Sequence, residues 1–226
     1  MPSGFPAAAA AERRYVGQTS VTVNLARIRK LKAMASDGRL EVEHVVEVAV
    51  SGSATDIPVL EDLVPSQDSA GVLVDWKLAA IQFLQGGCAA LQRYAEQPSR
   101  IPFVVGILEN VKTSASVSCL LGLSETFPDS GYRVAAALNL ILSFDDRPSL
   151  PPSVAAHVRI YLEGLVRQAD TEPHRAVAIL ALRGVGDAST LDLLKGQRAF
   201  DHPYQNTLRV TRKAIRRRLA IPPLLN

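Results

Sequence analysis

Apolar residues recur along this chain at spacings of three and four, and no segment shows sustained period-two alternation. The pattern is clearest over residues 70–86, 131–144 and 153–168. Within them one helical face collects Leu73, Trp76, Ala80, Phe83 and Leu84; then Val134, Leu138, Ile141 and Leu142; then Val154, Val158, Tyr161, Leu162 and Leu165. This periodicity predicts amphipathic helices throughout and an all-α fold.

Turn-forming residues interrupt the helical pattern roughly every 10 to 18 residues. These Gly-, Pro- and Ser-rich breaks fall at residues 36–38, 51–53, 86–87, 97–99, 128–131, 148–152 and 184–186. Helices of this length joined by short turns predict antiparallel helix pairs.

Two of the predicted helix starts resemble each other. Thr55 stands three residues before Pro58, and Ser99 stands three residues before Pro102. A hydroxyl can cap free amides at a helix start, and proline suits the first turn. Asp187 is a third candidate cap. A separation in the forties between starts is typical of stacked helix-pair repeats.

The segment ALRGVGDASTLDLL, residues 181–194, continues into Asp201-His202-Pro203 and a helix from Thr207 to Leu219. This order resembles a short bacterial HEAT repeat: an apolar helix, a Gly-x-Gly-Asp turn, a second helix, then an Asp/Pro turn. The likeness covers about residues 176–220 and extends more loosely to 43–85 and 99–144. It implies a right-handed α-solenoid of about five to six stacked antiparallel helix pairs, whose second helices line a concave face.

We therefore expect one solenoid domain over residues 21–220, with flexible tails at 1–20 and 221–226. Hydrophobic residues make up 47% of the chain, yet no apolar run approaches the length of a membrane span. The start lacks a basic region ahead of its alanines and does not resemble a secretion signal. Cys88 and Cys119 are interpreted as free buried thiols, which favours a cytoplasmic protein.

Charge is strongly segregated along the chain. Residues 1–36 carry a net charge of +5, residues 37–75 carry −8, and residues 204–226 carry +6. We interpret the acidic residues Glu41, Glu43, Glu47, Glu61 and Asp62 as the wet faces of amphipathic helices. The basic cluster Arg27, Arg29, Lys30 and Lys32 has the same interpretation.

The last predicted helix has the most specific candidate site. Leu208, Ile215 and Leu219 share one face, and Arg218 lies apart. The neighbouring basic ridge, named so from here on, consists of Arg209, Arg212, Lys213, Arg216 and Arg217. It could bind phosphates or an acidic protein surface. It could also be a solvated cap of the array, or dock on the acidic segment 37–75 of a second copy.

Catalytic chemistry has little support in the sequence. The histidines His44, His157, His174 and His202 lie in separate segments outside any nucleophile, metal or general-base motif. Asp145-Asp146 fits a solvated turn, and the spacing of Trp76 fits a core position. We expect no metal and no cofactor, and the sequence favours a non-catalytic protein over an enzyme.

The HEAT resemblance implies a binding protein, first of all a protein–protein adaptor or an inhibitor such as an immunity protein that binds a toxin. The alternative is a nucleic-acid-binding solenoid similar to HEAT-like alkylpurine DNA glycosylases. The aromatic content of 5% and the single tryptophan count against that alternative. A third resemblance, to bilin-lyase-like chaperones, ranks last because no pigment-specific motif is present. Oligomeric state stays open.

Overall fold

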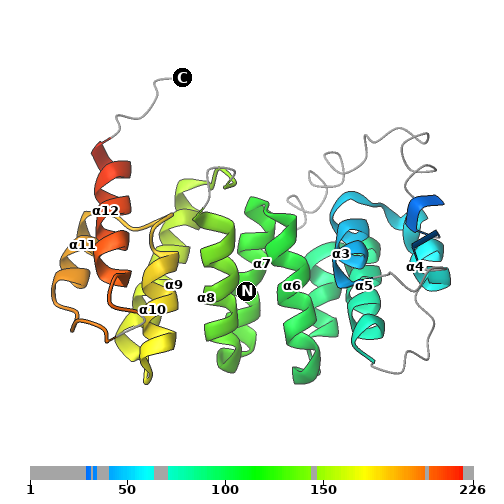
Figure 1. The fold of residues 1–226 in the computed structure, drawn as a ribbon, viewed down its shortest axis with the longest axis horizontal. Helices are drawn as coiled ribbons and strands as arrows, with labels where there is room; N and C mark the ends of the chain where they lie inside the picture. Colours follow the sequence, from blue (N-terminus) through cyan, green and yellow to red (C-terminus); the bar gives the residue numbers. More distant parts are fainter. Residues whose placement is uncertain are drawn as a thin grey trace, which may run out of the picture. The chain divides into compact units, whose positions relative to one another are not determined.

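The computed structural model describes residues 29–31, 33–34, 41–63, 71–143, 147–201 and 204–220. Every regular element in these ranges is an α-helix or a short 3₁₀ turn, so the predicted all-α class is confirmed for the described residues (Figure 1). The helices group into two compact units, Met1–Val111 and Lys112–Asn226. The predicted tails lie outside the described residues.

Unit 1 is built around one long helix. Helix α5 (Val72–Tyr94) packs against α3 (Val42–Ser51), α4 (Ile57–Leu63) and α6 (Ile101–Val111), and α3 also contacts α6. The core forms where these helices meet and contains Val45, Ala49, Leu60, Leu91, Val104 and Ile107. Burial of these aliphatic side chains stabilises the unit, at roughly 1.5–3 kcal/mol for each large one.

The interruption predicted at Gly86-Gly87 is found at Gly87, where two helical segments of α5 meet at a kink. Gly87 leaves the helical conformation with φ 58° and ψ −141°, and the residues before and after it are helical. Glycine reaches a positive φ without a steric penalty, so the chain kinks there and stays helical on both sides. The glycine pair marks a bend.

Pro58 and Pro102 each occupy the second position of a helix, α4 and α6, as the sequence predicts. The predicted hydroxyl caps are wrong. Thr55 lies inside the 3₁₀ turn η1 (Ala54–Asp56) and Ser99 inside η2 (Pro98–Arg100). In η1 the Asp56 carboxylate caps the turn by accepting a hydrogen bond from the Ser53 amide at 2.8 Å.

The described part of unit 2 contains six α-helices in sequence: α7 (Ser114–Thr126), α8 (Gly131–Leu142), α9 (Pro152–Gln168), α10 (Glu172–Ala181), α11 (Ala188–Lys195) and α12 (Thr207–Ala220). Helix α8 packs on α10 and α10 on α12, while α7 packs on α9. The consecutive pairs α7–α8, α9–α10 and α11–α12 are also in contact (Figure 1). The predicted α8 core residues Val134, Leu138, Ile141 and Leu142 are fully buried.

Contacts at both ends of α8 and α10, and at the end of α12, show that these helices run in parallel. At the starts of α8 and α10, the Tyr132 and His174 rings stack with centroids 4.3 Å apart. At their ends, Arg183 donates to Asn139 Oδ1 at 3.0 Å. At the end of α12, Arg218 reaches back to the segment that follows α10.

The Gly-Val-Gly-Asp turn between α10 and α11 is tightly packed. A Cβ atom added at Gly184 would lie 2.6 Å from the carbonyl oxygen of Leu142 in α8. One added at Gly186 would lie 2.6 Å from Ile215 in α12. The two glycines therefore allow the turn to sit against α8 and α12, and Asp187 then caps α11 as predicted.

Candidate functional site

The buried residues and the exposed charged residues of α12 lie on opposite sides of the helix. Thr207, Leu208, Thr211 and Ile215 are buried. At 100° per residue they cluster on one side, and the exposed cations cluster on the opposite side. Because α12 packs against α10 and α11, the exposed cations face away from these two helices.

Four members of the basic ridge lie together on the exposed side of α12, and the fifth, Arg212, contacts α11. Arg209, Lys213, Arg216 and Arg217 are exposed, and none forms an ion pair with another described residue. Arg209 does donate to Asn206 Oδ1 at 3.1 Å. Arg212 is half-buried, and its Nη2 donates to the carbonyl oxygen of Leu194 at the end of α11. Four cations are thus available to a partner.

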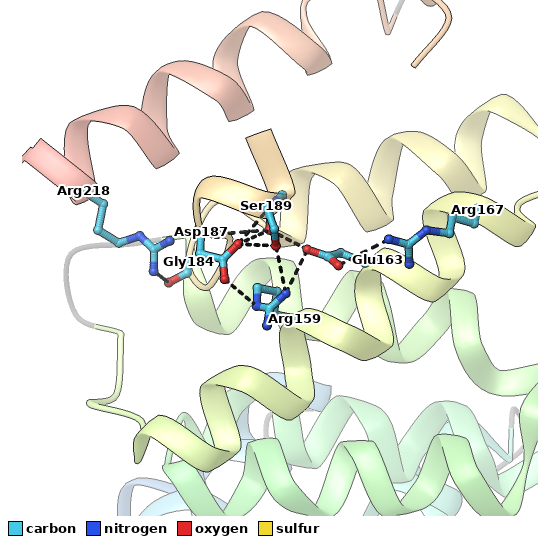
Figure 2. Close-up of polar contacts among 8 residues, drawn as sticks. Arg159, Glu163, Arg167, Gly184, Asp187, Ser189 and Arg218 are labelled. Atoms are coloured by element: carbon cyan, nitrogen blue, oxygen red, sulfur yellow. Dashed lines mark hydrogen bonds and ion pairs between the residues drawn. The ribbon is translucent and has the colours of Figure 1, made fainter. Parts of the chain in front are cut away.

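Arg218, which the sequence places apart from the ridge, fastens the end of α12. Its Nη1 donates to the carbonyl oxygen of Gly184 at 2.8 Å (Figure 2). Burial lowers the pKa of this guanidinium, nearby Arg147 lowers it further, and Asp187 opposes the shift. A half-buried arginine that satisfies a turn carbonyl is a structural group.

A polar network behind α12 joins α9 to the start of α11 (Figure 2). The Glu163 carboxylate is 6% exposed and accepts from the Thr190 hydroxyl at 2.6 Å and from Arg159 Nη1 at 3.3 Å. Arg159 also pairs with Asp187 at 3.1 Å. Because these charged groups satisfy one another, the network holds helices together and presents no reactive group.

Asp187 is the ionisable centre of this network. Burial raises the pKa of its carboxyl, but hydrogen bonds from Ser189 and Thr190 and the charge of Arg159 lower it by more. The net pKa is below the ordinary value of 3.8. The anionic form is therefore favoured by folding, as expected for a helix cap.

The acidic residues singled out in the sequence behave as wet helix faces. Glu43, Glu47, Glu61 and Asp62 are exposed on α3 and α4, Glu41 is exposed as the N-cap residue of α3, and Asp56 is buried as a cap. In the basic cluster, Arg29 and Lys30 are exposed beside buried Leu31. Arg27 and Lys32 lie outside the described residues.

The three described histidines serve local contacts on different helices. His44 Nδ1 accepts from the Glu41 amide at 3.1 Å, and His157 lies 3.2 Å from Glu125. His174 lies 3.2 Å from Asp170. Within the described ranges, no group of three or more His, Cys, Asp or Glu side chains could hold a metal ion. His202 and Asp145-Asp146 lie outside them.

The prediction of two free thiols is wrong. Neither Cys88 nor Cys119 is a free thiol, and only Cys119 is fully buried. The cytoplasmic location inferred from free thiols loses that support. No helix in the described part of the chain is both long and apolar enough to cross a membrane.

The chain matches no protein-family model, no curated protein and no solved structure.

Proposed function

We propose that the chain is a HEAT-like α-solenoid whose helix pairs stack in a right-handed array. The support comes from unit 2. There α8, α10 and α12 form a parallel series in which each helix contacts the next. Each of the consecutive pairs α7–α8, α9–α10 and α11–α12 joins one helix outside this series to one helix within it. In such an array a helix pair does not bury its apolar side by itself, so each pair packs against its neighbours.

The proposed function is to bind an acidic macromolecule, in the first place a protein, as an adaptor or inhibitor without bond chemistry. One observation carries this proposal. Arg209, Lys213, Arg216 and Arg217 project from the open side of α12, in a helix that contains no acidic residue. Arginine forms paired hydrogen bonds with carboxylates, which suits an acidic protein surface.

A protein partner fits the surroundings of the ridge better than a nucleic acid does. Val210 is 39% exposed and Leu219 is 50% exposed, so apolar surface flanks the cations. Arginine beside apolar side chains is typical of protein interfaces. Helix α12 contains no aromatic residue for base stacking, and Trp76 is half-buried against Phe103 in unit 1.

Fluorescence anisotropy with two labelled probes, poly-L-glutamate and a short DNA duplex, tests the proposal. We expect poly-L-glutamate to bind at low salt and the variant R209Q/K213Q/R216Q/R217Q to lose most of that binding. The matched control R29Q/K30Q/R93Q/K112Q removes four exposed cations from other places and should retain it.

Three results oppose the proposal. Equal loss in both variants would show only an effect of net charge. No binding of either probe would remove the ridge as a site. Preferential binding of the duplex, weakening roughly a hundredfold between about 50 and about 200 mM salt as four phosphate contacts require, would assign the ridge to nucleic acid.

A further inference from the structure

Helices α8 and α10 expose a shared apolar surface. Its members, called the α8/α10 face from here on, are Tyr132, Ala136, Leu140, Pro173, Val177 and Leu180. Tyr132 is 41% exposed and Leu140 is 43% exposed, and the other four are at least partly exposed. Isolated exposed apolar residues are ordinary on a protein surface, whereas a contiguous set marks a binding surface.

Helical periodicity makes these residues two adjacent rows. On α8 the spacing is four and four, and on α10 it is four and three. Each row lies opposite the buried side of its helix, which contains Val134 and Leu138 in α8 and Ile179 in α10. Because α8 and α10 are parallel and in contact, the rows belong to one outer surface of unit 2.

The positive charge beside this surface is concentrated on the neighbouring helix α12. Six of the eight Lys and Arg residues in α8, α10 and α12 lie on α12, and the one acid of these helices, Glu172, lies on α10. Glu172 lies 3.7 Å from Arg175. Helices α7, α9 and α11 contain three basic and three acidic residues. The α8–α10–α12 series therefore has a positive potential.

Cations border the apolar rows. Arg133 is exposed at the start of α8. On α12, Arg217 and the partly exposed Val210 lie about 140–160° around the helix from Arg212. Arg212 reaches α11, so Arg217 and Val210 are on the side of α12 that is turned away from α11. The partner that fits has an apolar centre and acidic margins.

We propose that the α8/α10 face binds one amphipathic helix of a partner protein, with an apolar stripe flanked by Asp and Glu. This inference rests on the proposed function and names the partner's chemistry. Exposed rows spaced at four residues form ridges, and a helix packs its own ridges between them. From Tyr132 to Leu140 the row is about 12 Å long, which matches two to three turns of a bound helix.

A panel of three labelled 18-residue peptides tests the proposal by anisotropy on the full chain. The first carries Leu at helical spacing with Glu on its flanks, the second replaces each Glu with Lys, and the third scrambles the first. We expect only the first to bind. Equal binding of the scrambled or the basic peptide, or no binding of the first, overturns the proposal.

Two variants locate the binding surface. Leu140→Asp and Tyr132→Ser should each weaken the acidic amphipathic peptide by about tenfold or more. The matched control is Ile160→Asp, on α9, where Ile160 is 60% exposed. Circular dichroism confirms that each variant is folded. If Ile160→Asp weakens the peptide as much as Leu140→Asp does, the α8/α10 face is not the site.

The same variants separate this inference from the proposed function. Poly-L-glutamate binding that survives Leu140→Asp, together with unchanged peptide binding, refutes the docking face and leaves the basic ridge standing. Loss of poly-L-glutamate binding in the ridge variant, with the peptide bound as tightly as before, would show that Arg217 does not meet the acidic margin of the peptide and would overturn the proposal while leaving the basic ridge as a site. Self-association abolished by Leu140→Asp assigns the face to a second copy and also overturns the proposal.

Discussion

Replacing Gly184 with alanine should destabilise unit 2, because the added methyl group has no room. Its Cβ would lie 2.6 Å from both the Cβ and the carbonyl oxygen of Leu142. The carbonyl oxygen belongs to the backbone at the end of α8 and cannot rotate away. The Gly184 carbonyl also accepts the hydrogen bond from Arg218, so movement of the turn disturbs α12 as well.

The magnitude follows from two opposing effects. Overpacking a filled site costs typically 1–3 kcal/mol. Replacing glycine also lowers the entropy of the unfolded chain, which returns about 0.4–1 kcal/mol. We expect a net loss of about 1–2 kcal/mol. The matched control is Gly164→Ala in the middle of α9, where an added Cβ meets nothing within 4 Å. This substitution should raise the free energy of unfolding by about 0.5–1 kcal/mol.

Urea and thermal unfolding followed by circular dichroism measure both variants. For a chain of this size each kcal/mol moves Tm by roughly 2–4 °C. The Tm of Gly184→Ala should therefore fall below that of the wild type and the Tm of Gly164→Ala should rise above it, so that the two variants differ by several degrees. Trp76, the single tryptophan, belongs to unit 1, so its fluorescence reports on the unit that neither substitution touches. If Gly184→Ala is as stable as Gly164→Ala, the close approach of the turn to α8 is refuted.

Two further substitutions test the polar network of unit 2. Glu163→Ala removes the short hydrogen bond from the buried Thr190 hydroxyl and the ion pair with Arg159, and it should cost about 2–4 kcal/mol in urea unfolding. Glu125→Ala at an exposed pair should stay within about 0.5 kcal/mol, and equal losses would contradict the network. The depressed pKa of Asp187 adds stability that is complete above its ordinary pKa of 3.8 and is lost as pH falls through the folded value. Asp187→Asn can still cap α11 but does not titrate, so its stability should fall less steeply than that of the wild type below about pH 4; parallel curves would refute the assignment.

The sequence predicts most of the elements because each has a local cause. The α8 core residues follow a strict helical period and are buried as predicted. Pro58, Pro102 and Asp187 mark helix starts because proline and a capping carboxylate act within one turn of their own position. Signals of this short range can be read without knowing what packs nearby.

The errors arise where neighbours in space decide the outcome. Arg212 belongs to the basic ridge by spacing, yet the carbonyl at the end of α11 draws it inward. The α8/α10 face was missed for the same reason, since a half-apolar helix shows which side is exposed only once its partners are placed.

The positions of the arginines on α12 argue against a purely structural basic ridge. Arg212 and Arg218 already satisfy carbonyl oxygens at Leu194 and Gly184, which is the stabilising work that a terminal helix needs. A cation gains from the helix dipole only in the last turn, where Arg217 lies. Arg209 stands in the first turn, where the dipole opposes it, and four like charges along one face repel one another. A solvated cap has no need of that arrangement, whereas an acidic partner offsets its cost on binding.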